Sequence, residues 1–181
     1  MRLTPRHPYE GVSAYGRLTS NWHEFFLADA FFVSGKSKDW STKCGCVVTT
    51  KGNDVLVRGW NDLPRKVKDA PERRERPAKY LWTEHAERNA IFNAARIGVS
   101  LLDATIYVNR VPCPDCARAI IQAGITTIVT TYADDEFEFA DRLNTRFSME
   151  LFKEVGMSII LYGDHVHKNL KRFRFEPNDL L

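Results

Sequence analysis

Two short stretches of the sequence combine residue types that can bind a metal ion and move protons. The first, His85–Glu87, reads His-Ala-Glu, and the second, Pro112–Cys116, reads Pro-Cys-Pro-Asp-Cys. Cys113 and Cys116 are three residues apart, so they project from one face of a helix. Two thiolates and one imidazole form a ligand set that suits zinc. The sequence therefore predicts a zinc site made by His85, Cys113 and Cys116.

The number of ligands in this set distinguishes a catalytic zinc site from a structural one. A structural site is expected to have four protein ligands, and no fourth is evident in the sequence. Three ligands leave the fourth tetrahedral position to water, which is typical of a catalytic site. Both stretches are predicted to begin helices, where the partial positive charge lowers the pKa of a thiol and favours the thiolate.

Glu87 is the predicted catalytic residue of this site. It follows His85 by two positions, which is about 200° around an ideal helix, so the two side chains should not share the metal. A carboxylate beside the metal can instead carry protons. A structural zinc site has no use for such a group, and a redox Cys-x-x-Cys pair would leave His85 and Glu87 unexplained.

Other reactive residues have simpler interpretations. Cys44 and Cys46 lie on a predicted strand and are expected to be small core residues. His165 and His167 are expected at the surface near the C-terminal end. The arginine-rich segment Pro71–Pro77 is balanced by its own acids, which favours a solvated loop over a phosphate or effector site.

Composition predicts one globular domain. The chain has 181 residues, 44% of them hydrophobic, and a formal net charge of +3, which is smaller than a dedicated nucleic-acid binder needs. The most apolar stretch, Phe25–Val33, is interrupted by Asp29 and is too short to span a bilayer. The N-terminal residues lack the apolar core of a secretory signal, so a cytoplasmic location without membrane attachment is expected. Four cysteines in such a chain favour metal binding or catalysis over disulfides.

Hydrophobic periodicity and helix-end signals predict an α/β fold. Ser20 or Asn21 is expected to cap the first helix, Thr83 to cap the helix that contains His85 and Gly98 to end that helix, while Pro112 opens the next one. The expected helices and strands alternate, which favours a mixed sheet covered by helices on both faces. The domain is expected over 20–163, after an N-terminal extension at 1–19 and before a polar C-terminal tail at 164–181. The expected elements are a helix at 20–34, strands at 44–50 and 54–60, a polar loop at 61–79, a helix at 84–97, a strand at 104–109, a helix at 112–124, a strand at 125–131, a largely helical segment at 135–155 and a strand at 157–162.

Several segments resemble deoxycytidylate (dCMP) deaminases, of the zinc-dependent cytidine/deoxycytidylate deaminase superfamily, over about residues 20 to 162. The zinc motif is shared across the superfamily. The Ser-Lys-Asp run, the Asn61 region and the long loop before His85 resemble the nucleotide-monophosphate branch. The matching segments are Ser37–Asp39, Gly59–Asn61, His85–Ala90, Pro112–Ala117 and Ile121–Ile125.

This resemblance implies a three-layer α/β/α fold with a mixed five-stranded sheet, one zinc ion per active site, and a homo-oligomer that is a dimer or a hexamer. By the same resemblance, Asn61 would contact the sugar or the base. Tyr132 would pack near the substrate. Ser37 and Lys38 would lie on the phosphate side of the nucleotide.

The activity implied is hydrolytic deamination of dCMP to dUMP with release of ammonia. Zinc-bound hydroxide would attack C4 of cytosine while Glu87 carries the proton. Alternatives are deamination of another cytosine nucleotide (5-substituted or ribo), of a tRNA adenosine or of a single-stranded DNA cytosine, and a non-enzymatic zinc-stabilised module. The tRNA enzymes read Cys-x-Gly-Ala after the second cysteine, whereas Cys116–Ala119 reads Cys-Ala-Arg-Ala here. Polynucleotide binding is therefore not expected.

One departure from the family pattern concerns regulation. The family's Gly-Tyr-Asn-Gly-x-Pro-x-Gly segment helps to form a site where dCTP activates and dTTP inhibits. In this chain Asp62 and Lys66 replace two of its glycines. Side chains at these positions obstruct a close approach of backbone to phosphate, which predicts weak or absent regulation.

Overall fold

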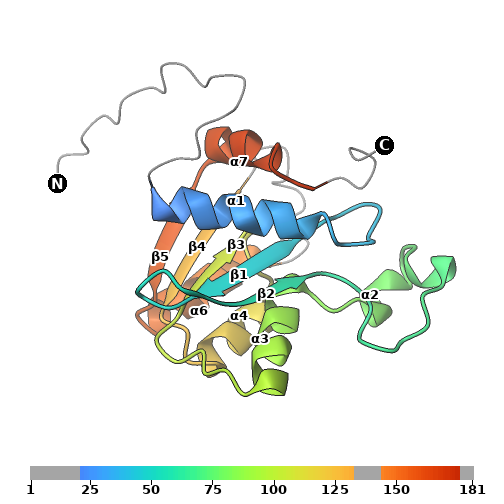
Figure 1. The fold of residues 1–181 in the computed structure, drawn as a ribbon, viewed down its shortest axis with the longest axis horizontal. Coiled ribbons are helices and arrows are strands. Elements are labelled where there is room, and N and C mark those ends of the chain that lie inside the picture. Colours follow the sequence, from blue (N-terminus) through green and yellow to red (C-terminus); the bar gives the residue numbers. More distant parts are fainter. Residues whose placement is uncertain (1–20, 133–143, 176–181) are drawn as a thin grey trace.

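The computed structural model describes residues 21–132 and 144–175, which form a mixed five-stranded sheet between two layers of helices (Figure 1). The strand order is β2-β1-β3-β4-β5. β1 is antiparallel to both of its neighbours, whereas β3, β4 and β5 are parallel to one another. This confirms the predicted α/β fold. The strands are β1 (Gly45–Thr49), β2 (Val55–Trp60), β3 (Thr105–Val108), β4 (Thr127–Thr131) and β5 (Ser158–Tyr162).

Different helices cover the two faces of the sheet. α1 and α7 cover one face of the sheet, and α3, α4 and α6 cover the other (Figure 1). The long connection after β2 contains two short helical turns, η1 and α2. The bounds are α1 (Trp22–Ser34), η1 (Pro71–Arg73), α2 (Lys79–Trp82), α3 (Ala86–Ile97), α4 (Pro114–Gln122), α6 (Thr145–Glu154) and α7 (Asp164–Lys171).

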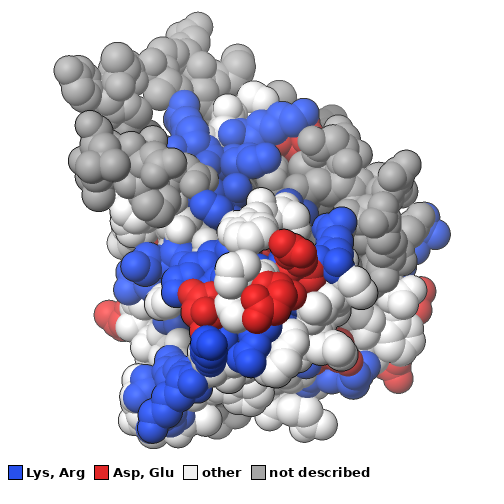
Figure 2. All heavy atoms as spheres, turned by 90° about the vertical axis from the view of Figure 1, so that its right-hand side faces the viewer, with Lys and Arg blue, Asp and Glu red and all other residues white. Residues whose placement is uncertain are grey.

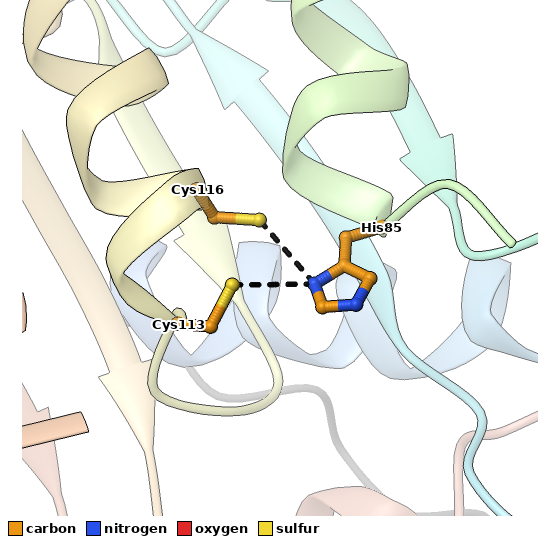
Figure 3. A group of neighbouring side chains, drawn as sticks. All are labelled: His85, Cys113 and Cys116. Atoms are coloured by element: carbon orange, nitrogen blue, oxygen red, sulfur yellow. Dashed lines mark hydrogen bonds between the residues drawn. The ribbon is translucent and has the colours of Figure 1, made fainter. Parts of the chain in front are cut away.

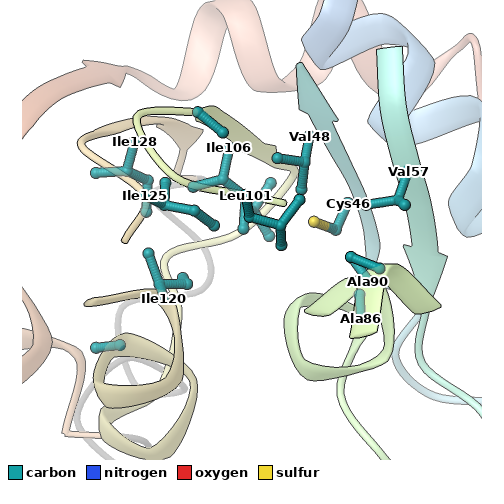
Figure 4. Close-up of a cluster of buried hydrophobic side chains, with 14 of the residues drawn as sticks. Cys46, Val48, Val57, Ala86, Ala90, Leu101, Ile106, Ile120, Ile125 and Ile128 are labelled. Atoms are coloured by element: carbon teal, nitrogen blue, oxygen red, sulfur yellow. The ribbon is translucent and has the colours of Figure 1, made fainter. Parts of the chain in front are cut away.

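A hydrophobic core lies on each face of the sheet, because successive side chains of the central strands point to opposite faces. In β3, Tyr107 packs towards α1, while Ile106 and Val108 face α3 and α4. Successive side chains of a strand point to opposite faces, so a strand covered on both sides is apolar throughout. Cys46 is fully buried in the core on the α3 side (Figure 4). Cys44 is partly buried and packs against the same core. The prediction that both are small core residues is confirmed.

The helices that carry the predicted metal ligands begin later than expected. α3 starts at Ala86 with His85 as its N-cap, and α4 starts after Cys113 as its N-cap. Thr83 instead ends α2, so its predicted capping of α3 is wrong. Pro112 does not open α4, because Pro114 takes the first-turn position that proline favours. The metal ligands thus lie at helix caps and in a first turn, where N–H groups have no partner in the helix.

The C-terminal region contains a helix where a polar tail was expected. α7 packs on α1, and its His167 and Leu170 are 2% and 6% exposed. The segment predicted as a polar tail therefore begins with a helix that packs on α1, and the prediction that His167 is a surface residue is wrong. Its ring Nδ1 lies 2.9 Å from the Thr131 hydroxyl. The predicted extension at 1–19 and the predicted helical segment at 135–143 lie outside the described residues.

Most of the arginine-rich segment is exposed, as expected of a solvated loop, but Arg73 and Arg74 are partly buried. The side chain of Arg74 is only 8% exposed and its Nε donates to Asp69 at 2.6 Å. The Arg73 guanidinium stacks over the Trp82 ring at 4.0 Å from its centroid.

Within the described ranges, no helix has both the length and the apolarity required to cross a bilayer.

Gly59 of β2 sets how closely α3 approaches the sheet. A Cβ built on Gly59 would overlap the backbone oxygen of Ala86 and lie 2.6 Å from the nitrogen of Ala90. Only a residue without a side chain allows the first turn of α3 to lie directly on the strand. The start of the helix that carries the histidine ligand is therefore held against β2.

Strand direction brings the functional segments to one end of the strands, where β1 begins and β2, β3 and β4 finish. This side of the sheet is here called the site edge. β3 runs antiparallel to β1, so β1 begins where β3 ends. Asn109, just after β3, accepts the N–H of Gly45 with its Oδ1 at 2.9 Å. The loop before β1, the end of β2 and the loops after β3 and β4 therefore meet at this edge. Ligands of α/β sheets commonly bind at such an edge.

Candidate metal centre and active site

Three predicted ligands converge at the site edge. His85 is the N-cap of α3, Cys113 is the N-cap of α4, and Cys116 lies in the first turn of α4. The Nδ1 of His85 is 3.5 Å from each sulfur (Figure 3). The three donor atoms all lie within 4.8 Å of one another. Cys113 and Cys116 follow His85 by 28 and 31 positions in the chain, yet the three side chains meet at one point.

These donor separations fit a tetrahedral zinc ion. Ligand distances of about 2.3 Å for zinc–sulfur and about 2.0–2.1 Å for zinc–nitrogen put sulfur and nitrogen about 3.6 Å apart at a tetrahedral angle. The observed separations of 3.5 Å agree with that value. The three residues would therefore hold zinc with little rearrangement.

The electrostatics of the three donors favour a cation. A hydrogen bond from the Cys116 thiol, together with the nearby His85, lowers the pKa of Cys113 to about 4. The Cys116 pKa is raised, because its proton bonds the Cys113 thiolate and because the thiol is buried. The His85 pKa is also raised, mainly by its hydrogen bond with Cys113. A metal ion would take the place of the protons that these groups share.

Glu87 lies in the first turn of α3, directly beside this cluster. Its side chain is 5% exposed, and burial raises the pKa of its carboxyl group. The cluster that could hold a metal comprises His85, Cys113 and Cys116 without Glu87. A buried carboxyl group with a raised pKa, next to a metal site but outside its ligand set, has the properties of a proton carrier.

Asn61 and Tyr132 lie at the site edge, at the ends of β2 and β4. Asn61 is 5% exposed, and its amide joins two backbone groups of the loop before β1. Its Oδ1 accepts the N–H of Cys44 at 2.7 Å, and its Nδ2 donates to the carbonyl of Thr42 at 2.9 Å. Asn61 thus has a structural role that the sequence did not reveal.

Tyr132 follows β4 and is 39% exposed.

Ser37 and Lys38 line a cavity of about 830 Å³ before β1. Ser37 is buried, and its hydroxyl accepts the N–H of Asp39 at 3.2 Å. Lys38 is exposed and pairs with Asp69 at 2.7 Å. Figure 2 shows the side of the molecule on which α2 lies, where Lys and Arg surround a small acidic group. The charged residues of the cavity wall are Lys36, Lys38, Asp39, Lys43, Asp69 and Arg74.

A set of ion pairs near the metal ligands was not predicted. Arg88 pairs with Glu84 at 2.6 Å and approaches Asp115 to 3.8 Å, so its guanidinium links α3 to the first turn of α4. The spacing of Glu84 and Arg88, four residues apart, is a signal that could have identified the first pair. The second pair joins two segments whose proximity only the fold establishes.

Comparison with known proteins agrees with this site. Residues 20–132 match the model of a family described as the cytidine and deoxycytidylate deaminase zinc-binding region. The chain belongs to this deaminase family. The deaminase is 35% identical over 146 residues to mouse deoxycytidylate deaminase, covering 76% of this chain and 77% of the mouse protein. It is 36% identical over 142 residues to an uncharacterised deaminase of Aliivibrio fischeri, covering 78% and 94% of the two chains.

Solved structures support the fold of the deaminase. The dCMP deaminase of cyanophage S-TIM5, solved in complex with dCMP and dUMP, aligns with a TM-score of 0.62 and 21% identity. The alignment covers 81% of this chain and the whole of the phage chain. The family model describes a zinc-binding region, and the donor geometry of His85, Cys113 and Cys116 fits a zinc site.

Proposed function

We propose that the chain hydrolyses dCMP to dUMP and ammonia. The observation that carries this proposal is the convergence of His85, Cys113 and Cys116 at one point, with buried Glu87 beside them. Three ligands leave a position open for water, and a carboxyl group outside the ligand set can move protons. Membership of the deaminase family and the similarity to mouse deoxycytidylate deaminase support a cytosine nucleotide as substrate.

The proposed mechanism assigns proton transfer to Glu87. Zinc at this site supplies a Lewis acid that makes water nucleophilic near neutral pH. Glu87 accepts one proton from the water that attacks C4 and transfers it to N3 of the base. It then takes the remaining proton from the new C4 hydroxyl and delivers it to the amine, which leaves as ammonia while C4 becomes a carbonyl. Burial raises the Glu87 pKa towards the working pH, so the group can both accept and release the proton.

Substrate contacts are proposed for Asn61, Tyr132, Ser37 and Lys38. Each Asn61 amide atom can form a hydrogen bond beyond the one that it makes with the backbone, so it can also reach the sugar or the base. Tyr132 is partly exposed at the same edge of the sheet. The basic cavity lined by Ser37 and Lys38 suits the phosphate of a monophosphate.

A substrate panel tests the proposed function. We expect kcat/KM for dCMP to exceed that for deoxycytidine by about 10- to 150-fold, because a charge-assisted hydrogen bond to phosphate contributes about 1.5–3 kcal/mol. Ammonia release is measured with dCMP, deoxycytidine, CMP, 5-methyl-dCMP, single-stranded DNA and tRNA. Equal rates on the nucleoside would contradict a phosphate contact. Activity only on polynucleotides would contradict the proposed substrate class.

We further propose that regulation of the enzyme by dCTP and dTTP is weak or absent. Asp62 is already engaged: its backbone pairs with Glu84, and its carboxylate accepts the N–H of Leu63 at 2.8 Å. Lys66 retains a left-handed backbone, with φ of 67°, but adds a side chain where the family has glycine. The KM for dCMP is therefore expected to change by less than about twofold with either triphosphate, because Asp62 repels phosphate. A sigmoidal dCMP saturation curve made hyperbolic by dCTP would contradict this expectation.

A homo-oligomer in the cytoplasm is also proposed. Leu81 of α2 and Phe92 and Ile97 of α3 are 89%, 51% and 54% exposed. Large apolar side chains that are left exposed at a surface are often covered by another subunit, which supports a dimer or a hexamer. All four cysteines lie in the described ranges and are not joined in disulfides, which supports a reducing compartment.

A further inference from the structure

A buried ion pair joins the loop before β1 to α2. The Nζ of Lys79 lies 2.7 and 3.0 Å from the carboxylate oxygens of Asp39 and 2.6 Å from the Ser41 hydroxyl. Both charged side chains are only 7% exposed. Lysine and aspartate are seldom buried to this extent unless they are paired, because desolvation of each charge is costly. The contacts made by this pair therefore indicate what it holds in place.

On one side of the pair, Asp39 fixes a tight turn. Its Oδ1 accepts the N–H groups of Ser41 at 2.9 Å and Thr42 at 3.0 Å. The same atom accepts the Ser41 hydroxyl at 3.1 Å. The hydrogen bonds from Lys79 and from these N–H groups lower the pKa of Asp39 despite its burial, so the carboxylate remains charged. A neutral side chain could not accept all of these donors.

The turn continues directly to Asn61. The carbonyl of Thr42 accepts the Asn61 Nδ2, and the N–H of Cys44 donates to the Asn61 Oδ1. The backbone N–H of Asn61 also donates to the carbonyl of Cys44 at 3.2 Å. An unbroken series of hydrogen bonds thus runs from Lys79 through Asp39 and the turn to the Asn61 amide.

On its other side, the pair is tied to the segment that carries the histidine ligand. Lys79 precedes His85 by six residues, and its carbonyl accepts the N–H of Thr83 at 2.9 Å. Glu84 then exchanges two backbone hydrogen bonds with Asp62, the residue after Asn61. The ion pair is therefore linked to both ends of the proposed site, the metal ligand and the residue proposed to contact the nucleoside.

We propose that Lys79 and Asp39 are positioning residues that hold the Asn61 amide in the orientation that binds the substrate. The inference rests on the proposed function, since it takes Asn61 as a substrate contact. A buried ion pair adds little net stability compared with an apolar pair of similar volume, but it fixes geometry through directional bonds. A misplacement of about 1 Å can reduce catalysis about 100-fold. Neither residue needs to touch the substrate.

The test separates positioning from stability with four variants. Lys79→Met and Asp39→Leu each leave one buried partner alone, whereas the double variant Asp39→Leu/Lys79→Met replaces the pair with apolar side chains. Lys79→Arg keeps the charge and is the conservative rescue. Steady-state kinetics with dCMP, zinc content and the thermal unfolding midpoint are measured for each. Arg58→Met is the matched control, because it removes another ion pair, that with Asp29 at 2.7 Å, without contact to Asn61.

We expect Lys79→Met to raise the KM for dCMP by about tenfold or more, with zinc still at one ion per chain. Lys79→Arg should recover part of that loss, and Arg58→Met should leave KM unchanged. The double variant should unfold at a higher temperature than Asp39→Leu, because no lysine is left buried alone. It should not recover KM, because the N–H groups of Ser41 and Thr42 still lack their acceptor. Recovery of both the unfolding midpoint and KM would show that the pair only stabilises the fold and would overturn the positioning role.

A double-mutant cycle with Asn61 tests the proposed route. If Lys79 acts through Asn61, then adding Lys79→Met to Asn61→Ala raises KM by less than about twofold, because the effects of coupled residues do not add. Full multiplication of the two effects would overturn the inference. An active wild type with a normal KM in Lys79→Met would overturn the positioning role alone. A wild type that does not turn over dCMP would overturn the proposed function and this inference with it.

Discussion

Glu87→Gln is expected to abolish nearly all dCMP turnover while the protein stays folded and keeps its zinc. The substitution preserves the size of the buried side chain but removes its ability to accept and release protons. General acid–base catalysis by one residue contributes about 10²- to 10⁴-fold, and here a single group is assigned several proton transfers. We expect kcat to fall by at least about 1,000-fold with little change in the KM for dCMP.

The measurement is the loss of cytosine absorbance, with zinc content determined on the same preparation. Glu150→Gln serves as the matched control, because Glu150 is an exposed glutamate on α6 away from the site edge. Its activity should equal that of the wild type. Near-normal turnover by Glu87→Gln with full zinc content would refute the role assigned to this carboxylate.

Cys113→Ser and His85→Ala are expected to lose the metal and, with it, all measurable activity. The Nδ1 of His85 lies 3.5 Å from each cysteine sulfur, so the three donors can share one metal ion. Removal of any one of them leaves only two ligands. A ligand present at 100 times its Kd stabilises the folded state by about 2.7 kcal/mol. Loss of zinc should therefore also lower the free energy of unfolding by at least about that amount.

Zinc is quantified by mass spectrometry after gel filtration, and unfolding is followed by circular dichroism. Cys44→Ser is the matched control, since this cysteine is partly buried but does not belong to the metal cluster. It should retain one zinc ion per chain. A Cys113→Ser protein with full zinc content would show that the ligand set is wrong.

The metal ligands could be predicted because their signal is local. Cys113 and Cys116 are neighbours on one helical turn, and the pattern around His85 requires no knowledge of the fold. Errors remained at the helix starts, where Pro112 and Pro114 both fit the first-turn position. A proline signal locates a helix start to within a residue or two, because both positions satisfy the same backbone constraint.

The supporting contacts could not be predicted because they depend on the fold. Lys79 and Asp39 are 40 residues apart, and in a polar segment each would be taken for a solvated charge. In α7, only the residues that face α1 are apolar or buried, so polar neighbours conceal the contribution of Leu170. The two backbone hydrogen bonds of the Asn61 amide likewise follow from the pairing of two segments that are distant in sequence.

Because α3 packs so closely on Gly59, this position limits which substitutions can be used to stabilise the protein. Replacing glycine in a strand normally adds β-propensity and restricts the unfolded chain, so stability designs often select such positions. At Gly59 a methyl group would meet the carbonyl of Ala86 and displace the helix whose cap is His85. A substitution chosen to strengthen the strand would therefore move a zinc ligand. Thermostable versions of this enzyme should be sought among variants that leave this glycine unchanged.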